Sequence, residues 1–296
     1  RAIRWPNATG LPEPWSPRYA PCMTILVTGA AGFIGSETCR ALLARGEEVI
    51  GIDNLNDYYD PALKQARLDR ISGEFHNGFT FEKVDFAEAD ALEAVASRYR
   101  IGSIVHLGAQ AGVRHSIDNP TAYVRSNLVG HCNLLELART REVTHFVYAS
   151  SSSVYGGNRS VPFRVEDRVD HPLSLYAATK KADELLSESY AHLYRIAMTG
   201  LRFFTVYGPW GRPDMALFKF TAAILEGRAI EIYGEGRMQR DFTYVDDLVA
   251  GILGLVGLPP PAPVAEHAGK PGRSAADTIA AEPGLSPSAP FRVVNI

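Results

Sequence analysis

Tyr176 and Lys180 have the residue types and the spacing that suit removal of a proton from an alcohol during hydride transfer. Four residues apart on a helix, a phenol and an ammonium lie on one face and are neighbours. A free phenol ionises only near about pH 10, and nearby positive charge favours its ionised form. Tyr176 is therefore a candidate general base, and Lys180 would supply part of the positive charge that it needs.

A run of serines, Ser150 to Ser153, precedes this pair. A serine hydroxyl can hold a substrate oxygen or relay its proton. The Tyr-x-x-x-Lys spacing alone is also compatible with a solvated helix face, because short motifs occur by chance. The order of the surrounding parts favours chemistry: a glycine loop after a strand, an acid ending the next strand, serines ending a later strand, and then the Tyr/Lys helix.

The glycine loop fits a dinucleotide site. Gly29, Gly32 and Gly35 lie between an apolar strand and a helix, where backbone amides can hold a pyrophosphate and missing side chains permit close approach. Asp53 ends the next strand, where a carboxylate accepts hydrogen bonds from the adenosine ribose hydroxyls. The sequence places no arginine beside Asp53 to receive a 2′-phosphate, so the pattern favours NAD over NADP.

Other residues expected to border the cofactor lie in the same loop or at later strand ends. They are Phe33, Ile34, Asn54, Asp85, Phe86, Leu107, Gly108, Ala109, Gln110, Asn127 and Ser150, together with Tyr176 and Lys180. Asn127 has two alternative interpretations, a buried structural amide or a brace for the active-site backbone.

Strand and helix patterns alternate from Met23 onward. The expected strands are 24–27, 48–53, 79–84, 101–107, 145–149 and 199–204, and the expected helices are 32–45, 61–71, 120–139 and 175–194. Strands joined by crossover helices predict an α/β fold with a doubly wound parallel (Rossmann) sheet and ligands at the carboxyl ends of its strands. Beyond residue 209 we expect a helix over 215–226, short strands at 230–233 and 241–244, a helix capped by Asp246, and a strand at 291–295.

Composition excludes several classes of function. The 296 residues carry a net charge of −3, which gives no basic field for nucleic acid and no polybasic membrane patch. The apolar stretch 245–258 contains two aspartates and is shorter than the roughly 20 residues of a membrane span. The three cysteines show no Cys-x-x-Cys spacing, so we expect no disulfide, which fits a reducing cytoplasm. The eight histidines show no metal-ligand spacing, so we expect no metal site, and we expect His106 to be a core residue.

Four longer strings carry a resemblance: 108–114 (GAQAGVR), 150–156 (SSSSVYG), 174–180 (SLYAATK) and 202–215 (RFFTVYGPWGRPDM). With them, the chain from Met23 onward resembles the extended short-chain dehydrogenase/reductase family, in its branch of nucleotide-sugar epimerases and dehydratases. Within that branch the strings are most similar to those of UDP-glucuronate 4-epimerases.

The resemblance implies NAD-dependent epimerisation of UDP-glucuronate to UDP-galacturonate through a transient 4-keto sugar, for polysaccharide biosynthesis. Tyr176 would be the base, Ser151 and Ser153 would bind the hydroxyl or relay its proton, and Lys180 would also hold the nicotinamide ribose. The substrate-binding residues that it implies are Ser151, Ser153, Thr205, Arg212, Met215, Tyr233 and Arg240.

Two of these positions bear on the type of sugar. Arg212 could grip the substrate carboxylate in a bidentate fork and so restrain loss of carbon dioxide from the 4-keto acid. Thr205 stands where galactose epimerases commonly have asparagine, which disfavours UDP-glucose.

The serine segment bears on the type of reaction. Related dehydratases place an acid before Val154-Tyr155, whereas this chain has serines, which favours simple epimerisation.

The expected organisation is a disordered tail at 1–22, an NAD-binding Rossmann domain at 23–206 onto which 236–257 packs back, and a small nucleotide-sugar-binding lobe. That lobe would comprise 207–235 and 258–296. Because the sequence stops at the end of an expected strand, we expect the lobe to be truncated. The resemblance also implies a homodimer formed through the helices near 120–139 and 175–194. Two alternatives stay open: another UDP-hexose 4-epimerase, and a non-catalytic NAD-binding regulator.

Overall fold

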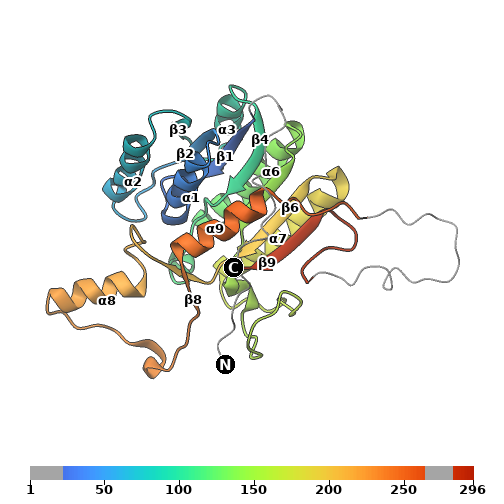
Figure 1. The fold of residues 1–296 in the computed structure, drawn as a ribbon. Coiled ribbons are helices and arrows are strands. Elements are labelled where there is room, and N and C mark those ends of the chain that lie inside the picture. Colours follow the sequence, from blue (N-terminus) through green and yellow to red (C-terminus); the bar gives the residue numbers. More distant parts are fainter. Residues whose placement is uncertain (1–22, 264–282) are drawn as a thin grey trace, which may run out of the picture.

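The computed structural model describes residues 23–263 and 283–296 (Figure 1). The expected tail at 1–22 and residues 264–282 lie outside the described residues. In the described ranges, seven parallel strands form one sheet in the order β3-β2-β1-β4-β5-β6-β9. The predicted doubly wound α/β fold is confirmed.

The strands of this sheet are each five or six residues long. They are β1 (Thr24–Thr28), β2 (Val49–Asp53), β3 (Phe79–Lys83), β4 (Ile101–His106), β5 (His145–Ala149), β6 (Ala197–Arg202) and β9 (Phe291–Asn295). Every residue of β1, β2 and β5 is buried, as expected for strands covered on both faces. The strand order reverses between β1 and β4, where parallel sheets of this kind bind ligands.

Helices cover both faces of the sheet, and one apolar cluster fills the space on each side (Figure 1). On one face lie α3 (Ala89–Ala96), α6 (Gly130–Thr140) and α7 (Leu175–Tyr194). On the other lie α1 (Phe33–Ala44), α2 (Pro61–Glu74) and α9 (Val245–Val256). α9 packs beside α1 on this face.

Local signals explain where two helices begin. The side chain of Asp60 accepts a hydrogen bond of 2.9 Å from the amide of Ala62, and Pro61 occupies the first helical position of α2. Ser174 caps α7 in the same way, with its hydroxyl 3.1 Å from the amide of Ala177. This cap fixes the start of the helix that carries Tyr176.

The expected helix over 120–139 is divided in the structure. It consists of α5 (Pro120–Tyr123), a π-helical turn η1 (Val124–Val129) and α6, preceded by the short α4 (His115–Asp118). A π-helical turn carries one extra residue per turn, and apolar periodicity does not reveal it. The helix α3 was not expected from the sequence at all.

Other expected elements need correction. Residues 230–232 form no strand although apolar residues alternate there, because no neighbouring strand in the described chain pairs with them, and a 3₁₀ turn η3 (Tyr233–Gly236) follows. Asp246 does not cap α9; Tyr244 holds the cap position, and Asp246 lies in the first turn, where negative charge favours the helix. The sixth strand spans 197–202 instead of 199–204.

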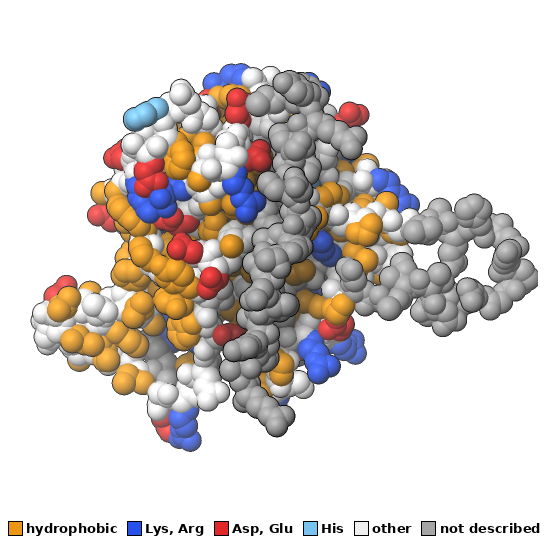
Figure 2. All heavy atoms as spheres, viewed as in Figure 1, with side chains coloured by type: hydrophobic (Ala, Val, Ile, Leu, Met, Phe, Trp, Pro, Cys, Tyr) orange, Lys and Arg blue, Asp and Glu red, His pale blue; other side chains and the backbone are white. Residues whose placement is uncertain are grey.

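A smaller lobe follows the sheet. It contains β7 (Thr205–Tyr207), which was not predicted, paired in parallel with β8 (Phe242–Tyr244), and the helix α8 (Ala216–Leu225). In Figure 1, α8 projects away from the main sheet, and Figure 2 shows hydrophobic side chains gathered over this lobe. β9 pairs with β6 in the main sheet, so residues 291–295 do not belong to the lobe as expected.

Two smaller features complete the fold. A 3₁₀ turn η2 (Ser152–Tyr155) follows β5 within the serine segment. None of the helices among the described residues has the length and apolar character required to cross a membrane.

Candidate active site

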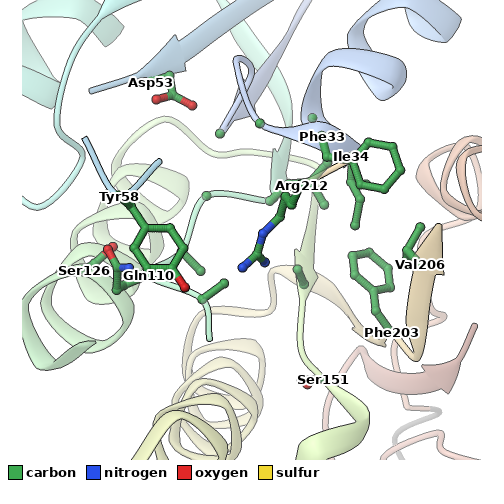
Figure 3. Close-up of a pocket in the computed structure, with 18 of the residues that line it drawn as sticks. Phe33, Ile34, Asp53, Tyr58, Gln110, Ser126, Ser151, Phe203, Val206 and Arg212 are labelled. Carbon is green, nitrogen blue, oxygen red and sulfur yellow. The ribbon is translucent and has the colours of Figure 1, made fainter. Parts of the chain in front are cut away.

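A cleft lies at the carboxyl ends of β1, β2, β4 and β5, and Arg212 and Met215, which precede α8, also line it (Figure 3). Most of the residues predicted to act at a site meet there. They are Gly29, Gly32, Phe33, Ile34, Gly35, Asp53, Asn54, Phe86, Leu107, Gly108, Ala109, Gln110, Ser150, Ser151, Tyr176, Lys180, Arg212 and Met215.

The glycine loop packs backbone against backbone. Gly29 has a φ of +68°, and a Cβ atom there would lie 2.8 Å from the Cα of Gly108. A Cβ atom on Gly35 would lie 2.0 Å from the carbonyl oxygen of Gly29, so α1 approaches β1 closely only because this residue is glycine. Gly32 is the N-cap of α1 and provides no side-chain cap, which leaves the first amides of the helix available to an anion.

Asp53 is held in place at the end of β2. Its carboxylate accepts hydrogen bonds from the amides of Ala31 at 3.3 Å and Leu55 at 2.8 Å. The ammonium of Lys64 lies 3.8 Å away and donates to Asn56 at 2.7 Å. Burial lowers the pKa of Lys64, although Asp53 opposes this effect.

Asp85 stands beside the cleft and supports a residue within it. Its carboxylate accepts hydrogen bonds from Asn54 at 3.2 Å, from the amide of Ala87 at 2.9 Å and from Arg125 at 2.7 Å. Burial acts to raise the pKa of Asp85, but these donors outweigh it and hold the pKa below its ordinary value. Asp85 thus contributes through Asn54, while Phe86 lines the cleft itself.

The cleft face of α7 presents Tyr176 and Lys180. The ring of Tyr176 meets the ring of Tyr123 edge to face, with centroids 6.1 Å apart. The Nζ of Lys180 donates to the carbonyl of Ala149 at 2.9 Å and to Asp183 at 3.2 Å. Phenol and ammonium therefore line the same cleft, although each already has neighbours of its own.

The serine segment divides into hydroxyls with different partners. Ser151 lines the cleft, and its oxygen accepts hydrogen bonds from the hydroxyl of Ser153 at 2.8 Å and from the amide of Ser153 at 3.2 Å. Ser153 itself does not line the cleft. The hydroxyl of Ser150 donates to Glu184 at 2.7 Å, so this serine reaches the cleft but directs its hydroxyl into the interior.

Glu184 belongs to a buried network that sequence reasoning missed. Arg202 donates to it twice, through Nε at 2.9 Å and Nη2 at 3.0 Å. Burial acts to raise the pKa of Glu184, but the hydrogen bonds from Arg202 dominate and lower it. The network ties α7 to β6 directly behind the serines, and a buried acid one turn beyond Lys180 was the signal that could have indicated it.

Asn127 lies in the π-helical turn and is 1% exposed. Its side-chain oxygen accepts from the amide of Gln110 at 2.8 Å, and its nitrogen donates to the carbonyl of Gln110 at 3.1 Å and to Thr179 at 3.0 Å. Of the two interpretations, these contacts favour a brace for the cleft backbone. His106 likewise is 1% exposed, with Nδ1 2.7 Å from the hydroxyl of Thr28, as expected for a core residue.

Arg212 points into the cleft near Tyr58 (Figure 3). Its Nε and Nη2 donate to the two carboxylate oxygens of Asp214 at 3.0 and 2.5 Å. The hydroxyl of Tyr58 donates to the same carboxylate at 3.1 Å, and burial together with Asp214 raises the pKa of Tyr58 to about 12. The guanidinium of Arg212, which was predicted to bind a substrate carboxylate, thus already binds the carboxylate of Asp214.

Thr205 and Arg240, two other predicted substrate residues, do not line the cleft. Thr205 is half-buried in β7. Arg240 is exposed and donates to the carbonyl of Gln239 at 2.6 Å. The side chain of Tyr233 lies outside the described part of the structure.

The cleft also contains residues that the sequence analysis did not assign to the site. They are Asn56, Tyr58, Tyr59, Lys64, Ala111, Ser126, Ala149, Phe203, Phe204 and Val206. Most follow the carboxyl end of a strand, as in the loop after Asp53, and that position was the available signal.

Known proteins resemble this chain in both sequence and structure. Residues 25–260 match the NAD dependent epimerase/dehydratase family. Protein CapI of Staphylococcus aureus is 53% identical over 274 residues, which cover 93% of this chain and 78% of that protein. A probable UDP-glucuronate 4-epimerase of Rhizobium meliloti (strain 1021) is 50% identical over 273 residues, covering 92% of this chain and 76% of that protein.

Among solved structures, a similar one is the UDP-glucuronic acid 4-epimerase of Bacillus cereus in complex with UDP-glucuronic acid and NAD. Its TM-score is 0.74 at 34% identity, and the match covers 93% of this chain and 77% of that one.

Proposed function

Because the chain belongs to the NAD dependent epimerase/dehydratase family, we propose that it is an NAD-dependent epimerase that converts UDP-glucuronate to UDP-galacturonate at C4. The observation that carries this proposal is one cleft with a glycine loop and Asp53 at one end and Tyr176, Lys180 and Ser151 at the other. That combination suits reversible oxidation of an alcohol.

The residues around the glycine loop fit NAD. The uncapped N-terminus of α1 suits a pyrophosphate, and Gly29 and Gly35 let the backbone come close to it. Asp53, fixed by two amides, offers its carboxylate to the adenosine ribose. When bound, the cofactor supplies a reversible acceptor for the C4 hydride.

Proton transfer is the task of the residues on α7 and at the end of β5. Tyr176 accepts the proton of the C4 hydroxyl and returns it when the ketone is reduced on its opposite face. The Lys180 ammonium favours the phenolate. Ser151, whose oxygen is oriented by Ser153, holds the reacting oxygen of the sugar.

The negative charge of the glucuronate carboxylate suits the part of the cleft that Arg212 lines. A 4-keto sugar with a carboxylate on C5 is a β-keto acid, which loses carbon dioxide unless its carboxylate is held out of the reactive orientation. Arg212 is a half-buried cation at the cleft that can bond such a carboxylate. The serine segment offers no acid to catalyse elimination.

The smaller lobe is proposed to bind the nucleotide half of the substrate. Met215, at the start of α8, lines the cleft and would form part of its wall. Tyr233 would pack on the uracil, Arg240 would meet the diphosphate, and Thr205 would border the sugar. Arg240 is exposed, so its role requires the lobe to close over the nucleotide.

The proposed assembly is a homodimer formed through η1, α6 and α7. Val124 and Val129 on η1 and Leu185 and Leu193 on α7 are exposed apolar residues on these adjacent elements.

The proposed location is the cytoplasm, with polysaccharide biosynthesis as the destination of the product. Support for a reducing compartment comes from Cys39, a free thiol in the core.

The test is direct. Purified protein incubated with NAD and UDP-glucuronate should yield UDP-galacturonate, identified by NMR, with no net NADH in the absorbance spectrum. The Tyr176→Phe variant should lose about two to four orders of magnitude in kcat and retain cofactor binding. A UDP-pentose as main product, or faster turnover of UDP-glucose than of UDP-glucuronate, would contradict the proposal.

A further inference from the structure

A second buried acid lies beside the lysine, and the mechanism above does not use it. The Nζ of Lys180 is 3.2 Å from Oδ2 of Asp183, and these side chains are 2% and 0% exposed. The same Nζ donates to the carbonyl of Ala149 at 2.9 Å. An ammonium has three N–H donors, so these two partners direct Lys180 and leave it a third donor at the cleft.

The other oxygen of Asp183 lacks this support. Within residues 23–263 and 283–296, Oδ1 is buried and has no hydrogen-bond partner. An ionised carboxylate is unfavourable in such a place. Burial accordingly raises the pKa of Asp183 to about 7, although Lys180 acts in the opposite direction.

The surrounding groups keep fixed protonation states near neutral pH. The ionisable groups that face Asp183 or Lys180 are Glu184 on α7, His131 on α6, Tyr148 on β5 and His106 on β4. Burial lowers the pKa of His131 to about 3, also lowers that of His106, and raises that of Tyr148. Arg202 overcomes burial and lowers the pKa of Glu184, so in this cluster Asp183 is the group that changes charge near pH 7.

We propose that Asp183 is a positioning residue for the catalytic lysine: it directs the Lys180 ammonium toward the cleft and its charge moderates the positive field that reaches Tyr176. Tyr176 lies one helical turn before Lys180, so a charge beside the lysine acts on the phenol as well. Charges in a buried site are screened less than in water. This inference rests on the proposed function for the role of Tyr176.

Two substitutions separate geometry from charge. Asp183→Asn keeps an oxygen for Lys180 and removes the charge, whereas Asp183→Leu removes both. For Asp183→Asn, the limb of the kcat/KM profile that reports ionisation of the phenol should move to lower pH by at least about 0.5 unit. Its NAD dissociation constant should stay within about twofold of the parent, while Asp183→Leu should weaken NAD binding by about tenfold, since Lys180 is then no longer directed.

Glu188→Gln is the matched control. Glu188 is also on α7, and its carboxylate accepts a hydrogen bond from Ser286 at 2.8 Å, away from Lys180. Removal of this charge should leave the pH profile and the affinity for NAD unchanged. An equal shift in Glu188→Gln would show that any charge on the helix has the same effect and would overturn the proposal.

A second readout requires no turnover. The pKa of folded Asp183 is raised from the ordinary 3.8 to about 7, so its contribution to stability is complete below about pH 4 and is lost as the pH rises through about 7. Relative to Asp183→Asn, the parent should therefore lose unfolding free energy between pH 4 and pH 8, measured by urea denaturation without cofactor. A constant difference across this range, together with an unmoved kinetic limb, would overturn the proposal.

The two hypotheses fail separately. If the parent shows no turnover of UDP-glucuronate, the proposed function is wrong, while the stability profile and the NAD titration still decide the role of Asp183.

Discussion

The guanidinium of Arg212 is the group in the cleft on which the choice of substrate is expected to depend. Its Nε and Nη2 already bond the carboxylate of Asp214, which also accepts from Tyr58. An incoming carboxylate must therefore either share the guanidinium through Nη1 or displace Asp214. The resemblance could predict the arginine, but not its internal partner, because Asp214 lies in a loop whose path is set by tertiary contacts.

Arg212→Lys tests this role at the residue scale. A lysine keeps the charge but cannot bond two carboxylates in one plane. The kcat/KM for UDP-glucuronate should fall about 10- to 100-fold, or about 1.4 to 2.8 kcal/mol, while that for UDP-glucose changes little. Product analysis should also detect a UDP-pentose, because a poorly held 4-keto acid loses carbon dioxide.

Arg98→Lys provides the control for that substitution. Arg98 is exposed and pairs with Glu82, away from the cleft lining and the proposed dimer surface, so the exchange should not alter turnover of either sugar. Equal losses of kcat/KM for UDP-glucuronate and UDP-glucose in Arg212→Lys would mean that the arginine organises the cleft but does not recognise the substrate carboxylate.

Glu184 makes stability depend on pH at a second residue. Its pKa in the folded protein is lowered, because the bonds to Arg202 outweigh the effect of burial. Its contribution is therefore present above the unfolded value of about 4.3 and is lost as the pH falls through the folded pKa. Glu184→Gln should cost about 3 to 5 kcal/mol of unfolding free energy at pH 7, since it leaves Arg202 buried and unpaired, and it should cost less in acid.

The comparison variant for this measurement is Glu226→Gln. Glu226 pairs with Arg228 at an exposed site, so its replacement should cost no more than about 1 kcal/mol. Similar losses in the two variants at pH 7, or a loss from Glu184→Gln that does not shrink in acid, would argue against the buried pair as the cause.

At the scale of elements, the π-helical turn η1 connects the helices of the proposed dimer interface to the cleft. It presents Asn127 to both backbone groups of Gln110, a residue of the cleft lining, and to Thr179 on α7. Apolar periodicity predicts a single helix over 120–139 and correctly indicates its position. It cannot reveal the π turn, because the turn depends on how α5 and α6 pack against α7.

Asn127→Ala should loosen this connection. Removal of the amide leaves the buried N–H and C=O of Gln110 without partners, which should cost about 2 to 4 kcal/mol of unfolding free energy in urea. The affinity for NAD should fall as well, because Gln110 borders the proposed cofactor site. Asn158→Ala, which removes one hydrogen bond at an exposed site, should cost no more than about 0.5 kcal/mol and leave NAD binding intact.

At the scale of the whole molecule, the main sheet could be predicted and the smaller lobe only in part. Six strands with crossover helices follow from apolar runs and turn residues, and right-handed crossovers then determine their arrangement. The strand over 291–295 was located correctly but assigned to the lobe, because pairing with β6 is a long-range contact. In the lobe, short strands such as β7 depend on pairing with a distant partner, here β8, which local propensity does not encode.

The last prediction concerns assembly of the whole protein. If two copies pair through η1, α6 and α7, a charge in that surface should separate them, because an unpaired buried carboxylate is unfavourable at an interface. Sedimentation velocity should give a dimer for the parent and a monomer for Leu185→Glu, at protein concentrations where the parent stays paired. Leu225→Glu is the control, since Leu225 is 82% exposed on α8, remote from α7, and should leave the dimer intact. A monomeric parent, or a Leu185→Glu variant that still sediments as a dimer, would rule out this surface as the interface.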